Sequence, residues 1–137
     1  MNTKIYKAVH GLAEKLLAAT NQNNQTTFDA LYEELKAICE EHDNTDKDHP
    51  VQWETLADFT EDYEEALALY AVAFKKAEAI DSKDFMTSIS FAMASLQDEL
   101  GHKDKAVEHL QIAKQCSEKI EDEELKREIH KLLKTLL

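Results

Sequence analysis

Acidic and histidine side chains gather in one short segment whose residue types could bind a metal ion. Residues 42–49 contain two histidines and three aspartates: His42, Asp43, Asp46, Asp48 and His49. A calcium-binding EF-hand needs alternating oxygen ligands, a glycine at its sixth position and a glutamate at its twelfth, and this segment does not provide them. The chain also has no HExxH motif. We therefore expect a solvated turn here, with no metal and no other cofactor.

The two cysteines are the candidates for nucleophilic chemistry. Cys39 and Cys116 are far apart in the sequence, form no CxxC pair and have apolar neighbours on their helix faces. A reactive thiolate needs a nearby positive charge or a histidine partner, whereas the apolar neighbours of both cysteines favour burial of the thiols. The two glycines are isolated, so no glycine-rich phosphate loop exists. We expect buried structural thiols in a reducing compartment, and no enzymatic activity.

The charge distribution limits the class of partner. The 137 residues include 16 lysines and arginines and 28 acids, a net charge of −12. Residues Phe28–Ala66 alone contain 14 acids and two lysines, which accounts for the whole excess. Such a chain repels phosphate, so we expect no binding to nucleic acid or to an anionic membrane. The acidic segment is either a solvated face or a surface that steers a basic partner.

The elements that must position these residues are helices. Two glycines and one proline are too few for the turns of a sheet protein, so the fold class is all-α. No signal-peptide core is present, and the longest apolar run, Ala66–Phe74, is half of what a bilayer requires. We expect a soluble, cytoplasmic protein.

Helical periodicity predicts about seven helices. They cover residues 3–19, 26–42, two segments between 50 and 80, 85–100, 103–120 and 122–137. Thr26 or Thr27 is the expected N-cap of the second helix, Asp48 or His49 of the third, and Thr60 of the fourth. Gly11 indicates close approach of a neighbouring helix, and Gly101 is the expected C-cap of the fifth helix.

An internal repeat appears when the sequence is shifted by 40 residues. The shift places Trp53 on Met93, Leu56 on Leu96, Ala66 on Ala106, Tyr70 on Leu110 and Ala73 on Ala113. The break near Thr60 then coincides with Gly101, which predicts two helices rather than one between residues 50 and 80. A fixed period of this length is typical of helical-repeat proteins.

Residues 63–77 and 103–117 resemble the tetratricopeptide repeat (TPR) family in its long, 40-residue form. The resemblance is carried by Ala66, Ala73, Ala106 and Ala113, small residues where the two helices of a repeat touch, with Tyr70 and Leu110 between them. Ala94 also matches, whereas Glu54 and Asp81 depart from the family pattern. The resemblance implies a right-handed α-solenoid of antiparallel helix pairs. It implies a single domain, 1–137, with a degenerate first repeat (1–42), two further repeats (50–80 and 84–120) and a capping helix (122–137).

The resemblance also implies a binding face, because the first helix of each repeat lines a concave groove in this family. The corresponding residues are Asp48, Val51, Thr55 and Asp58 in one repeat and Ser88, Phe91, Ser95 and Asp98 in the next. We expect Phe91 to be an exposed aromatic anchor among small residues, with the acids at the rim. Since these faces contain no basic residue, the expected ligand is an apolar and basic polypeptide segment, and an acidic tail peptide should not bind.

Other interpretations remain open at this point. The same side chains could simply pack between repeats. The chain could be a small secretion-type chaperone for one specific client, or a self-associating structural protein whose groove is an oligomer interface.

Overall fold

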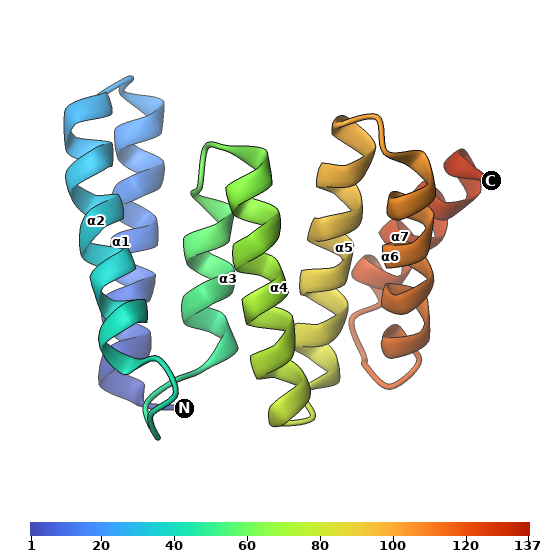
Figure 1. The fold of residues 1–137 in the computed structure, drawn as a ribbon, viewed down its shortest axis with the longest axis horizontal. Helices are drawn as coiled ribbons and strands as arrows, with labels where there is room; N and C mark the ends of the chain where they lie inside the picture. The colour runs from blue at the N-terminus through green and yellow to red at the C-terminus, as the bar shows by residue number, and fades with distance from the viewer. The chain divides into compact units, whose positions relative to one another are not determined.

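The computed structural model describes all 137 residues and consists of seven α-helices and no strand (Figure 1). The helices are α1 (Thr3–Asn21), α2 (Gln25–His42), α3 (Pro50–Asp58), α4 (Tyr63–Ala79), α5 (Lys83–Glu99), α6 (Lys103–Ser117) and α7 (Glu123–Leu136). The all-α class and the number of helices are thus confirmed. None of the seven combines the length and the apolar character that crossing a membrane requires.

Side-chain caps define most of the helix starts. The side chains of Asn2, Asn24, Ser82 and Asp122 each accept a hydrogen bond from the backbone N–H three residues later. Such bonds satisfy amides that have no partner inside the helix. The predicted cap at Thr26 or Thr27 is wrong, because Asn24 accepts from the Thr27 amide and α2 begins earlier.

The break between α3 and α4 exists, but the predicted cap at Thr60 is wrong. Asp62 accepts from the Glu65 amide at 3.1 Å. The Thr60 hydroxyl instead donates to the Leu56 carbonyl at 2.8 Å, and Thr60 is buried. Thr60 therefore satisfies a carbonyl group in the last turn of α3, and Asp62, two residues later, caps α4.

Four turns use a residue with positive φ. Gly101 (φ 80°) closes α5 as expected, and Asn23 (φ 54°), Asn44 (φ 60°) and Asp81 (φ 50°) adopt the left-handed conformation without being glycine. Asn and Asp tolerate this region better than other residues with a side chain. A chain with two glycines can therefore still make the tight turns between its helices.

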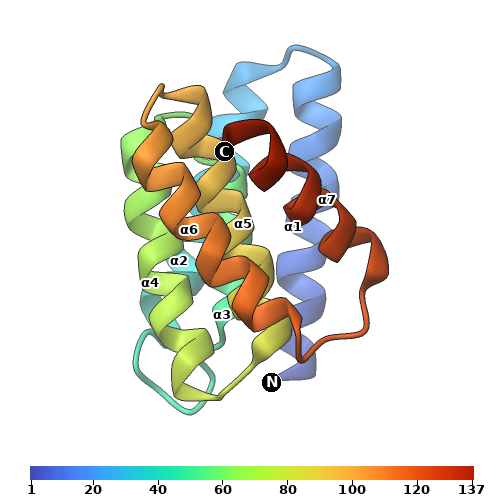
Figure 2. The same cartoon turned by 90° about the vertical axis from the view of Figure 1, so that its right-hand side faces the viewer.

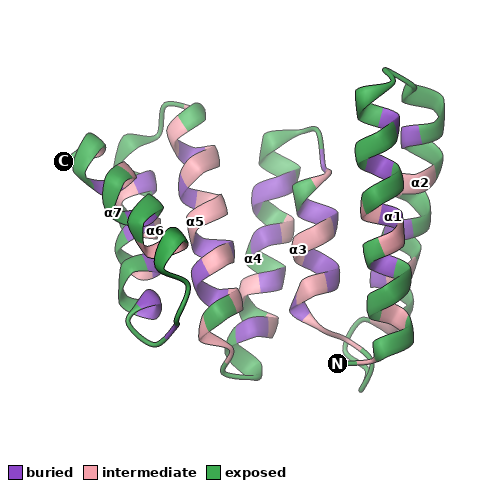
Figure 3. Ribbon diagram, turned by 180° about the vertical axis from the view of Figure 1, so that it is seen from behind, coloured by how far each residue is buried: buried purple, intermediate pink, exposed green.

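The contacts divide the chain into two compact units, 1–69 and 70–137, and the boundary falls inside α4. In the first unit α1 packs against α2, and both contact α3. Buried residues form stripes along each helix, with exposed residues between them (Figure 3). The most deeply buried large side chains of this unit are Val9, Leu16, Leu35 and Leu56.

In the second unit α6 packs against α5 and against α7 (Figure 2). Its core cluster contains Ala94, Leu110, Ala113, Ile129 and Leu133, so all three helices contribute. The alanines that define the repeat, Ala66, Ala73, Ala106 and Ala113, are at most 2% exposed. This burial is consistent with a helical repeat, because small residues let helix backbones approach closely.

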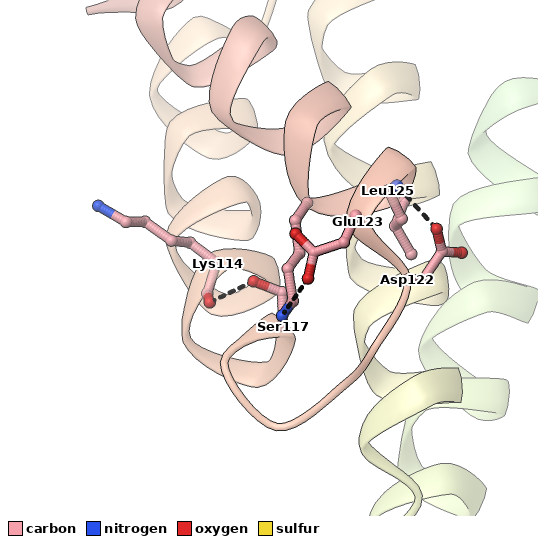
Figure 4. Close-up of polar contacts among 6 residues, drawn as sticks. Lys114, Ser117, Asp122, Glu123 and Leu125 are labelled. Carbon is pink, nitrogen blue, oxygen red and sulfur yellow. Dashed lines mark hydrogen bonds and ion pairs between the residues drawn. The ribbon is translucent and has the colours of Figure 1, made fainter.

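The connection from α6 to α7 differs from the prediction that the helix reaches Ile120. The Ser117 hydroxyl donates to the Lys114 carbonyl at 2.7 Å, and α6 ends there (Figure 4). The chain then turns and buries Ile120 at 5% exposure. Asp122 caps α7 through the Leu125 amide at 3.0 Å. Ile120 is thus buried from the turn that follows α6 and does not belong to a continued helix.

Gly11 does not mark a close helix approach, and that expectation is wrong. A Cβ atom built on Gly11 would have no neighbour within 4 Å, and the same holds at Gly101. The two positions differ in backbone conformation, because only Gly101 has a positive φ. Gly11 is thus an ordinary helical position occupied by a poor helix former.

We expect Gly11→Ala to raise the free energy of unfolding by about 0.5–1 kcal/mol, because alanine loses less backbone entropy in a helix. Urea denaturation measures the change. The matched control is Gly101→Ala, which has equal space but should destabilise the protein, since alanine at positive φ is strained. Equal effects at the two sites would contradict this account.

Candidate functional site

The first set of predicted binding residues lies at the start of α3 and along it. The Asp48 carboxylate accepts hydrogen bonds from the Trp53 indole N–H and from the Asn44 amide, both at 2.9 Å. The Thr55 hydroxyl donates to the Val51 carbonyl at 2.6 Å. Val51 and Thr55 are half-buried, and Asp58 is exposed. Asp48 therefore holds the turn before α3, which leaves it less available to a ligand than expected.

The second set lies on α5, and its central aromatic residue differs from the expectation. Phe91 is half-buried rather than exposed, and it packs against the core cluster formed by α5, α6 and α7. The Ser95 hydroxyl donates to the Phe91 carbonyl at 3.1 Å. Ser88 and Asp98 are also half-buried. Phe91 precedes the buried Ala94 by three residues, so both lie on the same side of α5.

Nowhere in the chain, segment 42–49 included, do three or more His, Cys, Asp or Glu side chains come together as they would around a metal ion. His49 is instead the N-cap of α3, where its Nδ1 accepts from the Val51 amide at 3.1 Å. Segment 42–49 thus positions α3, because the Asp48 carboxylate accepts from the Trp53 indole and His49 caps the helix.

Both cysteines are free and buried. The Cys39 thiol donates to the Gln52 carbonyl at 3.3 Å. Burial raises the pKa of the Cys116 thiol, and the nearby Lys83 only partly opposes this effect. A raised thiol pKa lowers the fraction of thiolate, which is the nucleophilic form.

The second unit contains an apolar groove that sequence analysis missed. Two cavities of about 490 and 210 Å³ adjoin, because Phe74, Glu78 and Ile112 line both. Met86 and Cys116 extend the larger one, and its remaining lining residues are Lys83, Gln115, Glu118 and Lys119. The smaller one is completed by Ala71, Lys75, Ser90, Met93 and His109. We call this surface the α4–α6 groove, because its walls are the second half of α4 and α6, with α5 between them.

The floor of the α4–α6 groove is apolar and its rim is mixed in charge. Phe74, Met93 and Ile112 are half-buried, so part of each side chain faces solvent. Methionine side chains adapt to ligands of different shape, which suits a surface that binds rather than one that only packs. The signal for this groove in the sequence is Ile112, an apolar residue that lies beside the buried positions Leu110 and Ala113 of the same helix.

The free energy of unfolding should depend on pH through His49, whose ring nitrogen caps α3. Burial lowers the pKa of His49 below 6.5, and the N-terminal ammonium adds to this, while Asp48 opposes it. The stabilisation that His49 contributes is therefore complete above the pKa that this residue has in the unfolded chain. It is lost as the pH falls through the lower pKa of His49 in the folded protein. Because the ring is partly exposed, we expect a loss of only about 0.5 kcal/mol.

Urea denaturation across this pH range measures that loss. The variant His49→Asn keeps an N-cap acceptor that does not titrate, so its stability should fall less on acidification. An identical pH profile for both proteins would contradict the role of His49.

Comparisons with models of protein families, with curated proteins and with solved structures found no match to the chain.

Proposed function

We propose that this protein is an interaction module that binds a polypeptide segment of another protein, apolar and basic in character. The observation that carries the proposal is the α4–α6 groove, a solvent-open apolar surface in a helical chain. The acidic segment 28–66 supports a basic partner, because opposite charge accelerates encounter. We further propose a right-handed, TPR-like solenoid, which the buried alanines at the repeat positions support.

Two surfaces of the second unit compete as the binding site. The α5 face with Ser88, Phe91, Ser95 and Asp98 follows from the family resemblance. Its aromatic ring, however, already packs on the core cluster. The α4–α6 groove leaves three large apolar side chains partly open to solvent. Since an apolar anchor supplies most of the affinity in many interfaces, we favour the groove as the main site.

The proposal includes a cytoplasmic location and no enzymatic activity. Two free thiols suit a reducing compartment. A client-specific chaperone would use the same groove for one partner, and a self-associating protein would fill it with a second copy of the chain.

The test is selection from a peptide library that varies apolar content and net charge, followed by titration of the selected peptides. We expect enrichment of apolar peptides, with basic ones above acidic ones, because the acidic segment 28–66 attracts positive charge although the groove rim itself is mixed in charge. Ile112→Glu should weaken binding at least about tenfold, because it places a charge on the apolar floor. The matched control is Ile80→Glu, since Ile80 is 54% exposed and lies outside the groove.

The other outcomes are equally informative. Loss of binding in Phe91→Ala but not in Ile112→Glu would move the site to the α5 face. Sedimentation at several concentrations tests self-association, which Ile112→Glu would abolish if a second copy occupied the groove. Selection of no peptide above background, with a monomeric protein, would overturn the proposed function.

A further inference from the structure

A second concave site lies in the first unit, and it combines aromatic rings with carboxylates. A cavity of about 250 Å³ opens where α2, the turn after α3 and the start of α4 meet. Its aromatic walls are Phe28, Tyr32 and Phe59, and Thr60 completes the floor. Its acids are Asp29, Glu61, Asp62 and Glu65, and no basic side chain lines it. We call it the aromatic–acidic pocket.

The aromatic walls hold one another in place. The rings of Phe28 and Tyr32 stack with centroids 6.4 Å apart and planes 15° apart, and Phe59 lies 6.4 Å from Phe28 at 60°. Phe28 is 8% exposed, whereas Tyr32 and Phe59 are half-buried and keep part of their surface open. The pocket thus has a rigid base and two accessible rings.

A chain of hydrogen bonds fixes the orientation of Tyr32. Its hydroxyl lies 2.6 Å from the Thr60 hydroxyl. Because Thr60 donates its own proton to the Leu56 carbonyl, Tyr32 must be the donor to Thr60. The ring is therefore positioned before any ligand arrives, which reduces the entropy lost on binding.

Two of the four carboxylates, those of Asp29 and Glu61, are bridged by one neutral group. The Gln25 side-chain amide donates to Asp29 at 2.8 Å and to Glu61 at 3.0 Å. Asp62 caps α4 through the Glu65 amide. These donors orient the acids but bring no positive charge, so four carboxylates face a pocket without a basic side chain in its lining. Such a site attracts a cation and repels an anion.

Aromatic faces and carboxylates together favour one class of cation. A guanidinium is planar, is weakly hydrated, stacks on aromatic rings and can bond two carboxylate oxygens at once. An ammonium group is a compact and strongly hydrated charge, which gains less from the rings.

We propose that the aromatic–acidic pocket binds one arginine side chain of a partner polypeptide, with the guanidinium stacked on Tyr32 or Phe59 and paired with the rim acids. The proposal rests on the proposed function only in that the arginine belongs to a polypeptide. The pocket and the α4–α6 groove share no residue, so they can be tested separately.

The probe is a short glycine–serine peptide with a single arginine, titrated into the full chain at low ionic strength and followed by NMR. We expect saturable shifts at the amides of residues 28–32 and 59–65. The same peptide with citrulline, which keeps the shape but lacks the charge, should not bind, and a lysine peptide should bind at least about threefold more weakly.

Matched variants separate the pocket from general charge attraction. The pair Glu61→Gln and Glu65→Gln should weaken binding of the arginine peptide at least about tenfold. The control pair Glu33→Gln and Glu34→Gln removes the same charge from exposed acids of α2 outside the pocket. With both pairs compared at an ionic strength of about 0.15 M, where charges outside the pocket are largely screened, the control pair should change binding less than about twofold. Tyr32→Leu should weaken binding, whereas Tyr32→Phe keeps the ring and should retain most of it.

Three results would overturn the proposal: equal binding of the arginine and citrulline peptides, equal losses in the two glutamine pairs, or shifts elsewhere in the chain. The variant Ile112→Glu should leave the arginine peptide unaffected. Failure of the groove and failure of the pocket therefore give different outcomes.

Discussion

Replacing Leu110 with alanine is expected to lower the free energy of unfolding by about 2–5 kcal/mol, the range for a fully buried leucine. Leu110 is 0% exposed and belongs to the core cluster that α5, α6 and α7 share. Truncation removes apolar contacts on all sides and leaves a cavity that packed helices fill only in part. Urea denaturation followed by circular dichroism measures the loss.

Leu17→Ala is the control for this change. Leu17 also lies in a helix interior, but its side chain is 55% exposed. Leucine and alanine have similar helix propensities, so we expect a change within about 0.5 kcal/mol. If Leu110→Ala lowered the free energy of unfolding as little as Leu17→Ala, the described packing of α6 against its neighbours would be contradicted.

The opposite change in size should also destabilise α6. Ala106 is 0% exposed, and Ala106→Leu should cost about 1–3 kcal/mol because three further carbon atoms must displace packed neighbours. Lys105→Leu introduces the same residue one position earlier, where the side chain is exposed, and should change stability by less than about 0.5 kcal/mol.

Ala106→Leu also tests the repeat, because Ala106 corresponds to Ala66 at the 40-residue shift. Thermal unfolding of both variants provides the measurement. A well-tolerated leucine at position 106 would mean that no close helix contact exists there, and the interpretation of the buried alanines would fail.

The helices were predictable from sequence because their signals are local. Apolar residues at spacings of three and four, with few glycines and prolines, require no knowledge of tertiary contacts. Cap residues were less predictable where several candidates stand together. Thr26, Thr27 and Asn24 can all cap a helix, and only the fold shows that the backbone already turns helical at Gln25.

The candidate sites were harder to predict because they depend on which helices cover which faces. The periodicity of α5 shows one buried stripe, but Phe91 is half-buried as well, because it packs against the core cluster that α5, α6 and α7 form together. The aromatic–acidic pocket joins Phe28 to Phe59, which lie 31 residues apart on different elements. Aromatic residues at helical spacing suggest core, and only tertiary structure shows that a solvent-open pocket lies beside them.

The turn residues with positive φ limit which substitutions this sequence can accept. Asn23, Asn44 and Asp81 have positive φ, so exchanges among asparagine, aspartate and glycine should be tolerated there. A valine or isoleucine at the same positions would be strained by the backbone conformation alone. Mutational scanning should therefore show three exposed loop positions that reject β-branched residues, with the restriction set by the sign of one backbone angle.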